Sequence, residues 1–457
     1  MGAVPSLKDN WKLAIILLVQ IALLGLIFRP GHFLWWDECT NVLLAKSVAL
    51  NPFSFETGVI GLHIESFRPH LLPWLIAIFG GSPEAGLYLV ILSSFLAIIL
   101  FYKFVETELG SDAAALSSIA LMASFWFLHM STRLYNDVPA LPLAFTTLLL
   151  AQRKMAKEAG VAFGLAALMR YTNFIIIFPV AFMLLKGEKK NVVQALLPFA
   201  ISAAAILSIQ LVLSDFLVYG LPFVSPIHQL LIFSNSPVPP QIFYYLEMFF
   251  SENPLLTALS IAGIAIAFVE KRSALLVWFF STYLFLELPL MHKEPRYVLA
   301  LMPLFGLFAG LFMARVGESL QKATKINLLK NFLFVAAALL LIYPVSGRIA
   351  SINSLEGGDP LFIKSLPLLD GKTIITNWHI EYKCHLNATV YSLWFKDDLT
   401  AAKDKLDYAV IYVSEYGGDA GGYSQNHHAL LGDDFVLEKN ITESEYKIGR
   451  VEIFRRK

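Results

Sequence analysis

Long apolar stretches recur through the first 346 residues of this 457-residue chain, and they limit its fold more than any other feature. A transmembrane helix needs about 20 mostly apolar residues, since lipid offers the backbone no hydrogen-bond partner. We therefore expect a polytopic α-helical membrane protein with 11 transmembrane helices. The fifth and sixth stretches are short, so they could form one hairpin with Arg170 and Tyr171 at its tip. The 11 stretches lie near 12–28, 86–102, 113–130, 138–151, 160–170, 172–185, 194–219, 254–270, 273–290, 297–314 and 331–346.

Charge is distributed unevenly along the chain. Of its 70 charged residues, 29 fall in 347–457 and 41 in the longer part before it, while 57% of the whole chain is hydrophobic. This composition excludes a disordered chain, a nucleic-acid-binding protein and a small disulfide scaffold. The sequence predicts a transmembrane domain at 1–346, which includes an outer loop at 29–85, and a soluble domain at 347–457.

The tail alternates strand-like runs with polar stretches that permit helices. A small C-terminal α/β domain fits this alternation. The strand-like runs lie at 373–376, 408–413 and 451–454.

Basic residues set the orientation, because Lys and Arg are retained on the cytoplasmic side. Alternate loops hold 15 of the 22 Lys and Arg residues of the membrane part, and the opposite loops hold seven. We expect a cytoplasmic N-terminus, with the loop 29–85 and the tail outside the cytoplasm or in a lumen. The first apolar run lacks a small-residue cleavage site, which indicates a retained anchor. Glycosylation acceptors at Asn387 and Asn440 fall in the tail and weakly support this topology.

Polar clusters lie at the outer ends of the predicted helices, although charged side chains at membrane depth cost several kcal/mol unless paired or hydrated. The acidic cluster could be an exposed pair in an interfacial aromatic belt, or a carboxylate in a partly dry cleft. The cluster between the third and fourth spans could equally be an Arg–Asp pair that reaches water. The clusters are 35–38, 67–70, 133–139, Arg170 and 292–297.

Together the clusters place cations opposite a carboxylate pair. Release of a phosphate from a membrane lipid needs cations to stabilise the leaving group, and a carboxylate to deprotonate the attacking hydroxyl. Direct displacement with one carboxylate as base would invert the anomeric centre. The cations at one predicted depth are Arg133, Arg170, Lys293 and Arg296.

Three of these motifs resemble those of the GT-C superfamily of membrane glycosyltransferases. Asp37-Glu38 resembles the acidic motif of the first outer loop in protein O-mannosyltransferases and lipid A aminoarabinose transferases. The segment 133–139 resembles the second acidic position of that family, and 292–297 is similar to the His-Lys-Glu-x-Arg motif of dolichyl-phosphate-mannose enzymes. In the latter enzymes a His-Pro precedes the acidic pair, whereas Trp35-Trp36 precedes it here.

The resemblance implies a GT-C fold and a glycosyltransferase that uses a polyprenyl- or dolichyl-phosphate sugar. Asp37 would be the catalytic base, and the four cations named above would hold the donor phosphate. The expected partners are the lipid bilayer, the lipid-linked donor, and a glycan, lipid or protein acceptor. A dense Asp-x-Asp ligand set is lacking, so we expect no required divalent metal. Residues expected to line or orient the site are Glu38, Arg68, His70, Asp137 and His292.

Two other functions remain open at this point. A secondary transporter or flippase for a lipid-linked or anionic substrate would carry binding groups near the bilayer midplane, often in repeated halves. The chain has no convincing repeat, and its charges lie at helix ends. A membrane scaffold whose tail recruits partners would leave the outer charges unexplained.

The two cysteines, Cys39 and Cys384, are both predicted outside the cytoplasm. They could pair in an oxidising compartment. One lies beside the acidic motif and the other deep in a separate predicted domain, so we expect them to remain unpaired.

Overall fold

The structure is a computed structural model of the whole chain, and it is largely helical. It divides into two compact units, each of which draws on separate parts of the sequence. Unit 1 comprises residues 1–28, 67–72 and 87–352, and unit 2 comprises 29–66, 73–86 and 353–457. The structure describes residues 11–457 except 30, 33, 54, 61–67, 187–190, 217–219, 229–242, 289–293, 326–334, 337, 340, 343–344, 356–359, 394–401, 415–430, 432–433 and 443–448.

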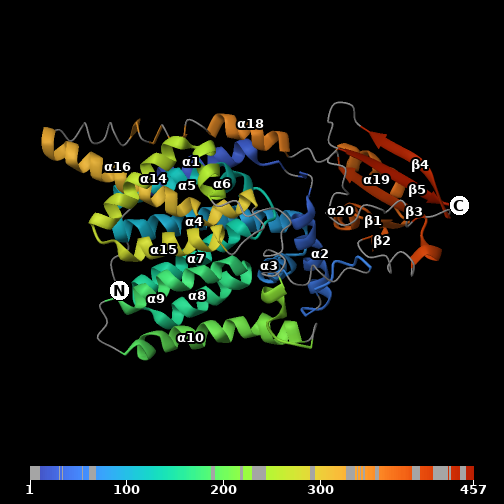
Figure 1. The fold of residues 1–457 in the computed structure, drawn as a ribbon, viewed down its shortest axis with the longest axis horizontal. Coiled ribbons are helices and arrows are strands. Elements are labelled where there is room, and N and C mark those ends of the chain that lie inside the picture. Colours follow the sequence, from blue (N-terminus) through green and yellow to red (C-terminus); the bar gives the residue numbers. More distant parts are fainter. Residues whose placement is uncertain are drawn as a thin grey trace. The chain divides into compact units, whose positions relative to one another are not determined.

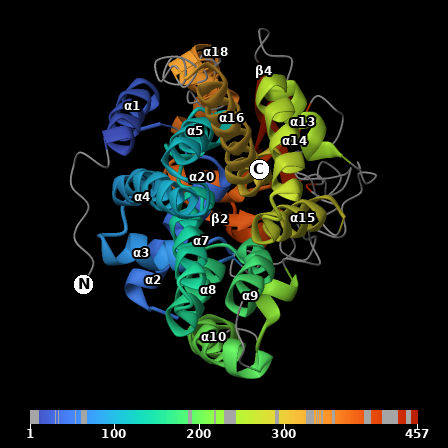
Figure 2. The ribbon, with the colours of Figure 1, turned by 90° about the vertical axis from the view of Figure 1, so that its left-hand side faces the viewer.

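Helices occupy most of the predicted spans of unit 1 (Figures 1 and 2). Three short irregular segments interrupt or extend them: the 3₁₀ segments η3 (Tyr171–Ile176) and η5 (Pro295–Ala300), and the π-helical η4 (Ile209–Ser214). The helices along the chain are α1 (Trp11–Ile27), α4 (Pro83–Leu109), α5 (Ser111–Met122), α6 (Phe125–Met130), α7 (Asp137–Gln152), α8 (Ala156–Met169), α9 (Ile177–Leu185), α10 (Val192–Ser208), α13 (Tyr244–Glu252), α14 (Pro254–Val269), α15 (Ser273–Glu287), α16 (Met302–Thr324) and α18 (Val345–Leu355).

Two predicted spans differ from the helices observed. The third, 113–130, is broken into α5 and α6, because the Ser124 side chain accepts a hydrogen bond from the Phe127 backbone amide at 3.2 Å and caps a new helix. Half of the last, 331–346, lies outside the described residues. Within the described residues, three segments are long and apolar enough to cross a membrane: Pro83–Leu109, Val192–Val212 and Met302–Thr324. The count of 11 spans stays a prediction.

Small residues allow the helices of unit 1 to approach closely. Gly310 of α16 lies against Ser117 of α5, and Gly160 of α8 lies against the Phe199 backbone of α10. Gly263 of α14 faces the carbonyl group of Phe308 on α16. Such small-residue contacts are the usual way for helices to associate where lipid removes the hydrophobic driving force. As a result α7, α8 and α10 lie side by side, as do α5, α16 and α14 (Figure 2).

Unit 2 contains a five-stranded mixed sheet in the order β2-β1-β3-β5-β4. The first three strands are parallel and β5 runs antiparallel to both β3 and β4. The strand runs predicted at 373–376, 408–413 and 451–454 are confirmed, while β2 and β4 were not predicted. The strands are β1 (Thr373–Thr376), β2 (Thr389–Ser392), β3 (Tyr408–Ser414), β4 (Phe435–Thr442) and β5 (Gly449–Arg456).

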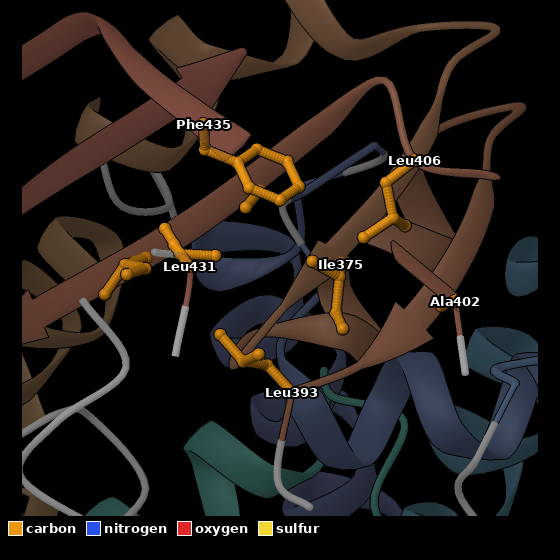
Figure 3. Packing of buried hydrophobic residues seen from close by; sticks show 8 residues of the cluster. Ile375, Leu393, Ala402, Leu406, Leu431 and Phe435 are labelled. Atoms are coloured by element: carbon orange, nitrogen blue, oxygen red, sulfur yellow. The ribbon is translucent and has the colours of Figure 1, made fainter. Parts of the chain in front are cut away.

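One face of this sheet packs on a small apolar core (Figure 3). Ile375 of β1 and Ile411 of β3 are fully buried there, and Leu406 and Phe435 are nearly so. β3 is buried over most of its length because it is the central strand, whereas β4 at the edge is largely exposed. The tail also contains the helices α19 (Pro360–Leu369) and α20 (His379–His385) and the short 3₁₀ helix η6 (Lys403–Lys405).

Segments from the first 86 residues also belong to unit 2. Helix α2 (Trp36–Leu50) contacts α20 of the tail, and Ile60 forms a parallel bridge with Tyr391 of strand β2. Helix α3 (Leu71–Ile78) packs Trp74 against the cluster of Leu44 and Val48 from α2. The sequence prediction counted the loop 29–85 with the membrane part, whereas residue contacts group most of it with the tail.

The close approach of α14 and α16 predicts that Gly263→Ala is destabilising, because the new methyl group would collide with the Phe308 carbonyl. Overpacking of this kind costs about 1–3 kcal/mol. Gly25→Ala is the matched control, since nothing lies within 4 Å of the methyl group it would add to α1. Thermal unfolding in detergent measures both variants, and equal melting temperatures would contradict the packing described.

Candidate functional site

A buried ion pair joins two helix ends in unit 1. Asp137 begins α7, and Arg170 follows the last residue of α8. The two side chains form an ion pair with only 5% and 14% of their surfaces exposed. Arg170 also donates from Nε to the Thr172 hydroxyl at 2.9 Å, and Asn136 donates to the Met169 carbonyl at 2.9 Å. The turn before α7 is thereby fixed to the end of α8.

Two arginines flank one tyrosine ring beside this pair. Arg170 lies over the ring of Tyr297 at 5.1 Å, and Arg296 lies 5.7 Å from the same ring. Arg296 is also 4.9 Å from the ring of Tyr135, and it forms an ion pair with Glu294. The faces of the aromatic rings attract the guanidinium groups electrostatically and hold them in place. Two predicted cations from distant parts of the sequence thus meet at one ring. We call Asp137, Arg170, Arg296, Tyr135 and Tyr297 the arginine cluster.

The junction between the third and fourth predicted spans supplies a further buried cation. Arg133 is 1% exposed and lies in the turn before Tyr135, whose backbone amide donates to the Arg133 carbonyl at 2.8 Å. The Tyr245 hydroxyl donates to the Glu294 carbonyl at 3.3 Å, and the Tyr245 amide donates to Glu287 at 2.9 Å. These contacts anchor the chain before η5, where Arg296 lies.

The segment with Arg68 and His70 is tied to the same region of unit 1. Tyr171 and Gln210 both donate to the Arg68 carbonyl, at 3.5 and 3.4 Å. Gln210 Oε1 accepts from the His70 amide at 3.3 Å, and Gln210 Nε2 donates to the Tyr171 hydroxyl. Since Tyr171 follows Arg170 directly, this network places the segment near the arginine cluster.

The acidic motif lies in unit 2 at the start of α2. Glu38 is fully buried, accepts a hydrogen bond from the Trp35 amide at 3.1 Å, and pairs with His32 Nε2 at 3.0 Å. Its carboxylate therefore caps the first turn of the helix. Asp37 is only half-buried. The two neighbouring carboxylates consequently have different environments, and Asp37 is the more accessible to solvent.

Aromatic residues of the tail hold this motif in place. The Trp36 ring contacts His379 edge to face with centroids 4.9 Å apart, and Trp35 meets Trp378 at 6.5 Å. Trp378 in turn stacks on Tyr412 of β3 at 4.3 Å. Burial of His379 lowers its pKa to about 3, so this imidazole is neutral at ordinary pH. The two tryptophans before the acidic pair thus pack against other residues of unit 2. The alternative of an interfacial aromatic belt would instead place them among lipid headgroups.

The structure brings together some of the predicted site residues. Asp137, Arg170 and Arg296 meet in the arginine cluster, and Arg68 and His70 are linked to it through Tyr171. Asp37 and Glu38 belong to unit 2, while His292 and Lys293 lie outside the described residues.

Sequence reasoning missed several contributors, among them Tyr135, Gln210, Tyr245 and Tyr297. Tyr135 lay inside a recognised motif, but its role depends on Arg296, 161 positions away (296 minus 135). The only sequence signal for Gln210 was its polar amide side chain near the end of an apolar run.

The fold matches two solved membrane enzymes over nearly the whole chain. ArnT from Cupriavidus metallidurans bound to undecaprenyl phosphate matches with a TM-score of 0.67 and 12% identity, covering 97% of each chain. The Archaeoglobus fulgidus oligosaccharyltransferase in its apo form matches with a TM-score of 0.61 and 13% identity, covering 97% of this chain and 74% of that one. No curated protein matches in sequence. The fold is thus that of the GT-C membrane glycosyltransferases.

The sequence identifies the family within that class. Residues 87–355, more than half of the chain, match the Alg9-like mannosyltransferase family. The protein belongs to this family and is a multi-pass membrane glycosyltransferase.

The buried His379 predicts that unit 2 loses stability in acid. An unfolded histidine takes up a proton below pH about 6.5, whereas folded His379 does so only near pH 3, so stability falls as the pH drops through this window. Between pH 7 and 5 the loss attributable to His379 is about 2 kcal/mol. His379→Phe keeps a ring beside Trp36 and cannot titrate, so its unfolding should depend less on pH.

Unfolding of the full chain in detergent, followed by tryptophan fluorescence at pH 7 and 5, measures this difference. The control is Tyr408→Phe, which also leaves a phenylalanine in unit 2 but removes no histidine, so it should keep the original dependence. Identical pH dependence in wild type and His379→Phe would show that His379 does not carry the effect.

Proposed function

We propose that the protein transfers a sugar, mannose or a similar one, from a polyprenyl- or dolichyl-phosphate donor to a hydroxyl acceptor. Membership of the Alg9-like mannosyltransferase family supports the sugar and the reaction class. The ArnT structure of the same fold contains undecaprenyl phosphate, which supports a polyprenyl phosphate as the carrier. The acceptor hydroxyl belongs to a glycan, a lipid or a protein.

The observation that carries this proposal is the pair of arginines on the Tyr297 ring. A lipid phosphate leaves with a developing negative charge, and guanidinium groups bind phosphate oxygens through two parallel hydrogen bonds. Arg170 and Arg296 are held by aromatic and carboxylate contacts, so little rearrangement is needed when the charge develops. Arg133 and Lys293 complete the proposed phosphate site, with His292 and Asp137 orienting the cations.

Asp37 is the proposed catalytic base. The Glu38 carboxylate caps α2 and pairs with His32, so its role is structural. Asp37 is only half-buried, so its carboxylate is the more accessible of the two. A single base that deprotonates the acceptor hydroxyl gives direct displacement at the anomeric carbon, and therefore inversion. Glu38, Arg68 and His70 position the surrounding segments.

The proposed reaction requires no divalent metal. In the arginine cluster two guanidinium groups supply positive charge of the kind that a metal ion would otherwise provide to the leaving phosphate. The proposed topology has a cytoplasmic N-terminus, with the acidic motif and the tail on the outer or luminal side, because 15 of 22 basic residues lie in the opposite loops.

Asp37→Asn should reduce kcat at least about 100-fold, since the amide cannot accept the proton of the attacking hydroxyl. The assay follows transfer from a polyprenyl-phosphate sugar by the purified enzyme in detergent. Asp434→Asn, an exposed position of the tail, is the matched control and should keep normal turnover. Undiminished transfer by Asp37→Asn would exclude it as the base, and a retained anomeric configuration would exclude direct displacement.

Arg296→Ala should lower kcat/KM for the donor by about 10–100-fold, which corresponds to about 1.4–2.7 kcal/mol of transition-state binding. Arg296→Lys keeps the charge but loses the planar contact with two tyrosine rings, so it should recover only part of the loss. The control is Arg315→Ala, which removes an arginine paired with Glu270 elsewhere in unit 1. Equal losses in the Arg296 and Arg315 variants would argue against a specific phosphate site.

A further inference from the structure

Three side chains with metal-binding atoms meet in unit 2. They are Cys39 on α2, and Cys384 and His385 at the end of α20. Their ligand atoms all lie within 4.8 Å of one another, although Cys39 and Cys384 are 345 positions apart in sequence (384 minus 39). The proximity overturns the reasoning that placed the two cysteines in separate domains. It arises because α2 packs on α20.

The spacing of these atoms suits a tetrahedral site. Cys39 Sγ lies 3.8 Å from His385 Nε2. With metal–sulfur and metal–nitrogen bonds of about 2.3 and 2.0 Å, the ligand atoms of a tetrahedral zinc site lie about 3.5–3.8 Å apart. Both groups also contact the Leu34 carbonyl: Cys39 Sγ at 3.3 Å and His385 Nε2 at 3.0 Å. One cation at this point could therefore replace the protons that the two groups share with that oxygen.

Charge and burial favour a cation at the same place. Cys39 is fully buried and Cys384 is partly buried, so two thiolates could not form there without a positive partner. A divalent cation with two thiolates and a neutral imidazole is electrically neutral, which removes most of the cost of burial. Glu38 and Glu381, both buried, add negative charge near Cys39. Thiolate and imidazole ligands together select a soft or borderline ion over magnesium or calcium.

We propose that Cys39, Cys384 and His385 bind a zinc ion, with the Leu34 carbonyl or water as fourth ligand. The site is separate from the arginine cluster of unit 1 and takes no part in the proposed displacement. The ion would fasten the first turns of α2 to the end of α20. Since Asp37 lies two residues before Cys39, the ion would also stabilise the turn that presents this carboxylate.

The two cysteines could instead form a Cys39–Cys384 disulfide, and the test must distinguish this bond from a zinc site. Full-length protein purified in detergent under a reducing agent and stripped with a chelator is titrated with Zn²⁺ against a competing zinc indicator. We expect one equivalent to bind and the melting temperature to rise. Co²⁺ in place of zinc should give the thiolate-to-cobalt charge-transfer band, and bound zinc should protect the partly buried Cys384 from alkylation.

Cys39→Ser, Cys384→Ser and His385→Ala should each weaken zinc binding by more than the about 10–100-fold that outer-shell substitutions cause. His228→Ala, the same change in unit 1, should bind zinc normally. Equal zinc affinity of wild type and the Cys39→Ser/Cys384→Ser variant would overturn the proposal. So would a zinc-free Cys39–Cys384 disulfide, found by non-reducing mass spectrometry of protein taken directly from its membrane. If the variants fail to fold, the cobalt spectrum and the alkylation pattern of the wild type decide the question.

Discussion

The ion pair between Asp137 and Arg170 is the contact on which the arrangement of unit 1 depends most. A charge in an apolar bundle is expensive alone, and removal of one partner of such a pair leaves the other buried without compensation. Because the pair joins the start of α7 to the end of α8, it fixes both helix ends at once. Tyr297 then brings η5 to the same point through its contact with Arg170. Three segments are thereby held around the two arginines.

Irregular backbone accompanies this centre. The 3₁₀ segments η3 and η5 carry Tyr171 and Arg296, and the π-helical η4 carries Gln210. Such departures from regular helix leave some backbone groups without intrahelical partners, and they are common where function is located. Side chains of these segments and their neighbours hydrogen-bond to nearby backbone: Gln210 and Tyr171 donate to the Arg68 carbonyl, and Asn136 donates to the Met169 carbonyl at the end of α8. These hydrogen bonds therefore also position the predicted site.

Local sequence pattern was sufficient for most of the helices within the predicted spans, for the inner strands and for singling out three members of the arginine cluster. Asp137, Arg170 and Arg296 were recognisable because a charge in an apolar run needs a reason. Strand β4 was not recognisable, because it is an exposed edge with little apolar alternation. Tyr135 and Tyr297 look like ordinary interfacial aromatics until the arginines that they contact are known. A local sequence pattern does not show which distant segments contact each other. For the same reason it did not predict that Cys39 lies close to Cys384.

The tail shares its core contacts with the segment that carries the acidic motif. The Trp36 ring contacts His379, Ile60 forms a bridge with strand β2, and Cys39 lies against His385. A tail that merely recruited partners would need none of these contacts, whereas a tail that supports the helix of Asp37 requires all of them. The α2 face buried in unit 2 would become exposed apolar surface if the tail were removed, and the capped turn at Glu38 would lose its aromatic support. The tail is therefore best understood as the structural support of the proposed base.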